Sequence, residues 1–136
     1  MIVDDHPLLR DTWAKFLCFH GNFRIVASTG DGAEAIKLAE ELKPDLILLD
    51  INMTPVSGFD VLLAIQNLSF KVIAVSMHAE ASYATKALKY GASAYLTKNA
   101  ASNELMSSIQ QVLSGKIYIC NEIKDILAFQ RVEDNN

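Results

Sequence analysis

Cysteine is scarce in this sequence, and so are proline and glycine, the residues that break helices and strands. Cys18 and Cys120 are too few and too widely spaced for a disulfide framework or a metal knuckle, so we expect a reducing, cytoplasmic setting. With 3 prolines and 6 glycines in 136 residues, the composition excludes a collagen-like fibre. No apolar run approaches the roughly 20 residues that a membrane-spanning helix needs, so we expect no membrane partner.

Positive charge is also limited. The 12 lysines and arginines are outnumbered by 16 aspartates and glutamates, the net charge is −4, and there is no basic run. Nucleic-acid binding depends on cationic contacts to phosphates. We therefore expect that these residues do not bind DNA unaided.

Apolar residues are plentiful, at 51% of the chain, which is enough for one domain with a substantial core. Short apolar runs alternate with segments that have helical spacing, which indicates an α/β fold with a parallel sheet. We expect five strands, at residues 2–3, 23–27, 46–49, 71–75 and 94–97. Four helices are expected at residues 8–20, 59–68, 79–90 and 102–113. A fifth is expected to begin after a cap at Asp31 and to end at Lys43-Pro44. Residues 121–130 have the pattern of one further helix.

Acidic, hydroxyl and basic residues stand at the ends of four predicted strands. They are Asp4, Asp5, Asp50, Ser76 and Lys98. Ligands of open parallel sheets bind at the carboxyl ends of the strands, so we expect these side chains to gather at one edge. Three crowded carboxylates require a cation, and Mg²⁺ prefers oxygen ligands. A carboxylate can also accept a phosphoryl group as a nucleophile, which predicts Mg²⁺-dependent phosphorylation of Asp50.

Four motifs at these positions resemble the receiver domain of two-component response regulators. They are Ile2-Val3-Asp4-Asp5-His6-Pro7, Leu48-Leu49-Asp50-Ile51-Asn52-Met53 followed by Gly58, Ala74-Val75-Ser76-Met77-His78, and Gly91-Ala92-Ser93-Ala94-Tyr95-Leu96-Thr97-Lys98. The resemblance covers residues 1 to about 114. Within the family, the sequence looks most like the NarL/FixJ subfamily, whose output domain is a LuxR-type helix-turn-helix.

The resemblance implies a fold and a domain organisation. The fold is the flavodoxin-like (CheY-like) one, a doubly wound, five-stranded parallel sheet of order 2-1-3-4-5 with five flanking helices. Residues 1–115 would form the receiver domain. Residues 116–136 would form a connector toward an output domain beyond Asn136.

The resemblance also implies roles around the phosphoacceptor, Asp50. Mg²⁺ would be bound by Asp5, by Asp50 and by the backbone carbonyl of Asn52, with Asp4 acting through water. Lys98 would contact the phosphoryl group.

Three further positions match residues that respond to phosphorylation in this family. Ser76 would turn toward the phosphoryl group, and the ring of Tyr95 would change orientation with it. His78, together with the side chain of Asn52, would set the rate at which the phosphoaspartate hydrolyses.

The expected partners are a sensor histidine kinase as phosphoryl donor and, on phosphorylation, a second copy of the chain. DNA would be reached only through the output domain, so the function is a signalling one and not that of a turnover enzyme. A stand-alone receiver is the main alternative. A haloacid-dehalogenase-type phosphatase is less favoured, because it needs an acid/base aspartate where this chain has Asn52. A flavodoxin-like FMN module would need a phosphate-binding loop in place of the two aspartates after the first strand.

The sequence departs from the family pattern in two places. The usual proline after the phosphoacceptor is displaced by one residue, so that Thr54 precedes Pro55. The lysine is followed by Asn99 and not by proline, and a cis bond there would cost about 2.5–4 kcal/mol. We therefore expect a trans bond, or a strained one, between Lys98 and Asn99.

Overall fold

The computed structural model describes residues 1–66 and 68–134, and its centre is a parallel sheet. Six strands lie in the order β2-β1-β3-β4-β5-β6. Their bounds are β1 (Ile2–Val3), β2 (Ser28–Thr29), β3 (Leu46–Asp50), β4 (Lys71–Ser76), β5 (Ala94–Thr97) and β6 (Tyr118–Ile119). The predicted order 2-1-3-4-5 is confirmed, and the carboxyl ends of all these strands point to the same edge.

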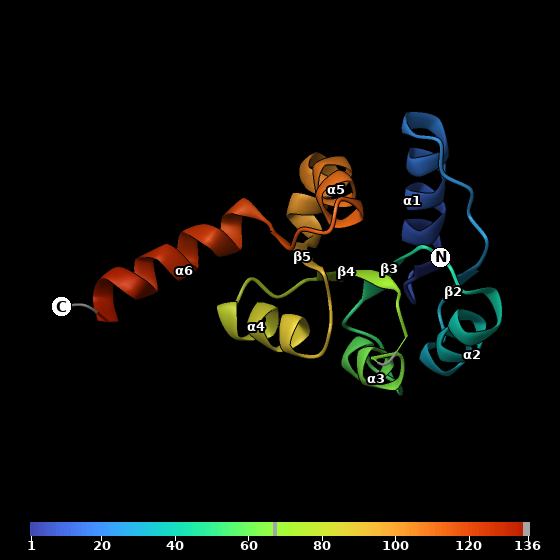
Figure 1. Cartoon of the computed structure of the whole chain (residues 1–136), viewed down its shortest axis with the longest axis horizontal. Coiled ribbons are helices and arrows are strands. Elements are labelled where there is room, and N and C mark those ends of the chain that lie inside the picture. Colours follow the sequence, from blue (N-terminus) through green and yellow to red (C-terminus); the bar gives the residue numbers. More distant parts are fainter. Residues whose placement is uncertain (67, 135–136) are drawn as a thin grey trace.

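Helices cover both faces of the sheet. Their bounds are α1 (Pro7–His20), α2 (Gly32–Leu42), α3 (Gly58–Ala64), α4 (Ala81–Lys89), α5 (Lys98–Leu113) and α6 (Asn121–Asp134). Helices α1 and α5 lie on one face, and α2, α3 and α4 lie on the other (Figure 1). The fold is therefore the doubly wound one that the resemblance implies, whereas α6 extends away from the sheet (Figure 1).

The helices α2, α3 and α5 begin at residues with side-chain caps. Asp31, predicted as a cap, accepts hydrogen bonds from the backbone N–H groups of Ala33 and Glu34. At the start of α3, Ser57 and Asp60 form a reciprocal capping box. Thr97 caps α5 by accepting from the N–H of Ala100, which starts this helix directly at Lys98. The last cap matters for the site, because it holds Lys98 where β5 ends.

The core consists of the middle strands and the helix faces packed on them. The largest fully buried side chains are Tyr95, Ile2, Ile47, Leu49, Ile51, Leu62, Ile73, Leu96, Leu105, Ile109, Ile123 and Val3. Strands β3 and β4 are buried along nearly their whole length, as the continuous apolar runs predicted. Within the described residues, no helix is long and apolar enough to cross a membrane.

Several predicted elements differ from the structure in their bounds. The helix expected at 102–113 begins earlier, at Lys98, because Thr97 caps it. The strand expected at residues 23–27 is wrong, since β2 is confined to Ser28–Thr29. Ile2 pairs with Ser28, so Ala27 is level with Met1, and among the described residues β1 has nothing that could pair with residues 23–26. The helix expected at 59–68 ends at Ala64 in the structure, and residue 67 of that prediction lies outside the described residues.

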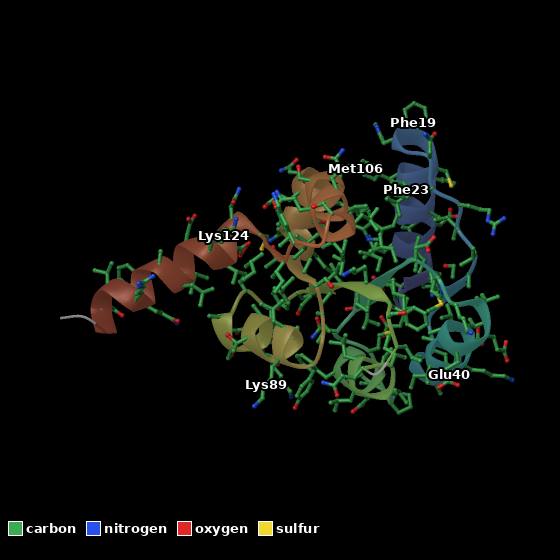
Figure 2. The ribbon with its side chains drawn as sticks, in the orientation of Figure 1. Phe19, Phe23, Glu40, Lys89, Met106 and Lys124 are labelled. Carbon is green, nitrogen blue, oxygen red and sulfur yellow. The ribbon has the colours of Figure 1, made fainter. Side chains whose placement is uncertain are left out.

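The prediction of five strands is wrong by one, whereas the further helix predicted at residues 121–130 is confirmed as α6. Residues Tyr118 and Ile119 pair with Ala94 and Tyr95, which adds β6 beside β5. Tyr118 and Cys120 are buried in the core, together with Ile123 from the first turn of α6. The tail therefore begins as part of the sheet before α6 extends outward. Lys124 lies near the start of this helix (Figure 2), and Ile126 and Leu127 still pack against the core.

Candidate phosphorylation site

The carboxyl edge of the sheet brings the predicted acidic residues and the lysine together. Asp50 is the last residue of β3, and Lys98 is the first residue of α5, directly after β5. The ammonium Nζ of Lys98 lies 3.5 Å from Oδ2 of Asp50 and 3.7 Å from Oδ2 of Asp4. The Asp50 side chain is fully buried, and that of Asp4 is 5% exposed. One cation thus lies between two buried carboxylates that would otherwise repel each other.

The acidic cluster also fits a divalent cation. Asp4, Asp5, His6 and Asp50 each offer a ligand atom, and these atoms all lie within 4.8 Å of one another. His6 Nδ1 lies 2.9 Å from Oδ1 of Asp4 and 3.1 Å from Oδ1 of Asp5. Three carboxylates form a hard oxygen donor set, which suits Mg²⁺ better than a softer metal. The residues present therefore fit the predicted ion.

The environment of Asp50 makes its carboxylate more basic than an exposed one. Burial raises the pKa of Asp50, and the neighbouring charges of Asp4 and Asp5 raise it further. Two groups oppose this rise in pKa: the backbone N–H of Asn52, which donates to Oδ1 of Asp50 at 2.9 Å, and the ammonium of Lys98. Asp50 is thus a buried carboxylate held in place by one hydrogen bond and one ion pair.

Ser76, at the end of β4, is bonded to the loop that follows β3. Its Oγ donates to the side-chain oxygen Oδ1 of Asn52 at 3.0 Å, and the backbone N–H of Met77 donates to the same oxygen at 3.0 Å. The N–H of His78 donates to Oγ of Ser76 at 3.0 Å. The hydroxyl, which is completely buried, therefore belongs to a network that joins β3 to β4.

Tyr95 lies in β5 with its ring inside the protein. The side chain is 0% exposed, and its hydroxyl donates to the backbone carbonyl of His78 at 2.6 Å. Burial raises the pKa of Tyr95 to about 12, so the hydroxyl keeps its proton and acts as a donor. The ring of His78 stacks on Tyr83 of α4, with 4.2 Å between the centroids. Tyr95 thus links β5 to the segment between β4 and α4.

The two departures from the family pattern have different outcomes. Within the described part of the chain, Thr54–Pro55 is the one cis peptide bond. The bond between Lys98 and Asn99 is therefore trans, and Asn99 continues directly into α5.

Sequence reasoning missed two contacts that shape the site. A guanidinium nitrogen of Arg10 donates to the backbone carbonyl of Asp4 at 2.6 Å, which ties α1 to the acidic turn. Gly58 lies so close to β3 that an added Cβ would stand 2.5 Å from the carbonyl oxygen of Asp50 and 2.5 Å from Cα of Ile51. The position of Gly58 in its motif could have indicated a close backbone approach, but nothing in the sequence singles out Arg10.

Comparison with known proteins agrees with this arrangement. The profile of the Response regulator receiver domain matches residues 1–110. The chain belongs to this family. The transcriptional regulatory protein DegU of Brevibacillus brevis is 38% identical over 124 residues, which cover 88% of this chain and 51% of that protein. The response regulator GacA of Pseudomonas aeruginosa is 34% identical, over 96% of this chain and 62% of that protein.

The structural comparison supports the same family. A two-component response regulator of the LuxR family from Aurantimonas sp. SI85-9A1 has a TM-score of 0.91 and 29% identity, covering 97% of this chain and 96% of that one. The relatives are thus regulators of the NarL and LuxR type, in agreement with the narrower resemblance. This receiver domain has a phosphoryl-accepting signalling role, and its relatives are signalling proteins, not turnover enzymes. The chain spans about half to two thirds of the length of these curated relatives.

Proposed function

We propose that this receiver domain accepts a phosphoryl group on Asp50 from a sensor histidine kinase. The observation that supports the proposal is the position of Asp50, a buried carboxylate at the carboxyl end of β3 with Lys98 Nζ 3.5 Å away. Asp4 and Asp5 complete an acidic cluster at the same edge. Burying a carboxylate beside a lysine and two further carboxylates contributes little to the stability of a fold. Such a cluster is typical of a site that carries out chemistry, here the acceptance of a phosphoryl group.

The transfer is a displacement at phosphorus. An oxygen of Asp50 forms the new O–P bond, while the P–N bond of the donor phosphohistidine breaks and its electron pair stays on the imidazole. That nitrogen takes a proton from a buffer acid, which leaves the conjugate base of the buffer, a neutral histidine and an acyl phosphate on Asp50. The hydrogen bond from the N–H of Asn52 holds the Asp50 carboxylate in position, and Lys98 offsets the charge that gathers on the phosphoryl oxygens.

The acidic cluster would hold Mg²⁺. Asp5 and Asp50 would be direct ligands with the backbone carbonyl of Asn52, and Asp4, whose Oδ2 already faces Lys98, would act through water. When bound, the ion offsets the negative charge of the carboxylates and of the phosphoryl oxygens. Removal of divalent cations should therefore abolish phosphorylation without unfolding the domain.

Phosphorylation would then change the surface next to the site. Ser76 would donate its hydroxyl proton to a phosphoryl oxygen, and Tyr95, bonded to the carbonyl of His78, would follow the movement of the segment before α4. A dianionic group near these donors favours whichever conformation brings them closer. His78 and Asn52 would influence the lifetime of the acyl phosphate through the access they leave to water.

We propose transcription regulation as the output, through a DNA-binding domain beyond the connector at residues 116–136. The support is that one relative is a transcriptional regulatory protein, of which this chain covers 51%, and that another is a DNA-binding response regulator of the LuxR family. Residues 1–115 would be the receiver itself, acting in the cytoplasm and forming a homodimer on phosphorylation. A stand-alone receiver is the second candidate, since the part of the chain described here contains every proposed site residue.

Intact-protein mass spectrometry after exposure to acetyl phosphate tests the proposal. We expect one phosphoryl adduct with Mg²⁺, none with excess chelator, and none for Asp50→Asn. As a matched control, Asp125→Asn changes an exposed aspartate in α6 and should retain the adduct. An adduct that persists in Asp50→Asn would show that another residue is the nucleophile.

A further inference from the structure

Asn52 is bonded on two sides, to Asp50 through its backbone and to the end of β4 through its side chain. Its N–H donates to Oδ1 of Asp50 at 2.9 Å, while its amide oxygen accepts two hydrogen bonds from the other side, from Ser76 and from the N–H of Met77. Both donor–acceptor distances are 3.0 Å, so the two acceptor positions of that oxygen are filled. Asn52 thus bridges the proposed phosphoacceptor and the end of β4.

A hydroxyl group has one proton, and this limits what Ser76 can do. While that proton is donated to Asn52, it cannot be donated to a phosphoryl oxygen on Asp50. The Ser76 oxygen is also fixed by a second hydrogen bond, because the backbone N–H of His78 donates to it at 3.0 Å. The hydroxyl is completely buried, so water does not offer it a competing partner.

We propose that Asn52 is a positioning residue that holds the Ser76 hydroxyl away from the phosphoryl position in the unphosphorylated domain. The inference rests on the proposed function and adds a competition to it. The amide oxygen of Asn52 and the phosphoryl oxygens on Asp50 compete for the hydrogen bond of the Ser76 hydroxyl. The activating movement of Ser76 therefore begins with the loss of its hydrogen bond to Asn52.

The competition can be reversed because the two acceptors differ in strength. An amide oxygen is neutral, whereas a phosphoryl oxygen carries negative charge and forms shorter and stronger hydrogen bonds with the same donors. Phosphorylation would therefore move the hydrogen bond of the Ser76 hydroxyl from Asn52 to the phosphoryl group on Asp50, and hydrolysis would return it. The backbone of Asn52 need not move in either direction, since its N–H stays on Asp50.

The affinity for beryllium fluoride, a tetrahedral analogue of the phosphoryl group, tests this competition in the full chain at saturating Mg²⁺. Asn52→Ala removes the competing oxygen but leaves the backbone, so we expect it to bind the analogue about tenfold more tightly than the unmodified chain. The serine side chain in Asn52→Ser is too short to reach Ser76, so this variant should bind the analogue as tightly as Asn52→Ala. Asn103→Ala, at an exposed position in α5, is the matched control and should leave the affinity unchanged.

A double-mutant cycle distinguishes positioning from a general effect on the loop. In the Ser76→Ala background the donor that Asn52 restrains is absent, so Asn52→Ala should give a clearly smaller gain in affinity. The Met77 amide resonance should also shift in Asn52→Ala without any ligand. Unchanged or weaker binding by folded Asn52→Ala and Asn52→Ser would overturn the inference, as would an equal gain in both backgrounds. If the unmodified chain took up neither analogue nor phosphoryl group, the proposed function itself would fail.

Discussion

At the residue scale, the site depends on one cation among several carboxylates. Lys98 is 17% exposed, and its Nζ lies within 4 Å of both Asp50 and Asp4. A partly buried ammonium interacts more strongly than one in water, because less solvent screens it. Lys98 therefore stabilises the cluster before phosphorylation and is placed to offset phosphoryl charge during it.

Replacement of Lys98 tests the second of these roles. We expect Lys98→Met to slow phosphorylation by acetyl phosphate about 100-fold, the scale found when one preorganised electrostatic group is removed from an active site. The rate can be followed by intact mass at fixed Mg²⁺. Lys89→Met changes an exposed lysine in α4 and should retain the original rate. Equal rates for both variants would mean that Lys98 serves only the stability of the cluster.

The sequence predicted which residues meet at this edge but not how they bond. Asp50, Ser76 and Lys98 could be predicted because each stands at a strand end, and parallel strands end on the same side. The bond from Ser76 to Asn52 joins residues 24 positions apart and depends on the path of the loop after β3. Side-chain direction in a loop has no periodicity, so the sequence could not have revealed this contact.

At the element scale, the central strands were predicted from their apolar runs, whereas the two edge strands β2 and β6 were not. Strands β3, β4 and β5 are buried apolar runs, and their predicted positions agree with the structure to within one residue. The edges depend on pairing: apolar residues at 23–27 do not form a strand, whereas residues 118–119 do because β5 offers them a partner. A strand needs a neighbour as much as it needs a suitable sequence.

Tyr118 links the sixth strand to α5, and its titration is predicted to affect stability. Its hydroxyl donates to Oε1 of Glu104 at 2.6 Å, and its pKa is raised to about 12, first by burial and then by Glu104. Since the folded state holds this proton more tightly than the unfolded state, the contribution of Tyr118 to stability is complete below pH 10. It is lost progressively as the pH rises toward 12.

Comparison with Tyr118→Phe isolates this effect from other groups that titrate at high pH. At neutral pH the variant should be about 2 kcal/mol less stable to urea, because it loses a hydrogen bond to a charged acceptor. The difference between the two proteins should shrink between pH 10 and 12. A difference that stays constant across this range would show that Glu104 does not hold the proton on Tyr118.

At the scale of the whole molecule, the tail has two parts with different relations to the domain. Tyr118, Cys120 and Ile123 are buried in the common core, and Thr97 donates to the carboxylate of Glu122 at 3.1 Å. Further along α6, Phe129 is 64% exposed. The first part of the tail is therefore packed as a piece of the receiver, and the later part presents exposed apolar side chains.

Two truncations separate these parts. Ending the chain after Gly115 removes three buried side chains and should lower the free energy of unfolding by about 4 kcal/mol. Ending it after Ala128 removes exposed residues of α6 and should change the stability by less than about 1 kcal/mol. Urea titration of both forms checks this. Equal stability of the two forms would show that the tail contributes nothing to the receiver fold.

The most direct test of the central claim locates the phosphoryl group on the chain. Borohydride reduces an acyl phosphate to an alcohol, so the phosphorylated residue is marked permanently and can be found by peptide mass spectrometry. We predict conversion of Asp50 to homoserine in the peptide that contains β3, and only after phosphorylation with Mg²⁺. A mark on Asp4 or Asp5, or none in a protein that carries the adduct, would contradict the assignment of Asp50 as the acceptor.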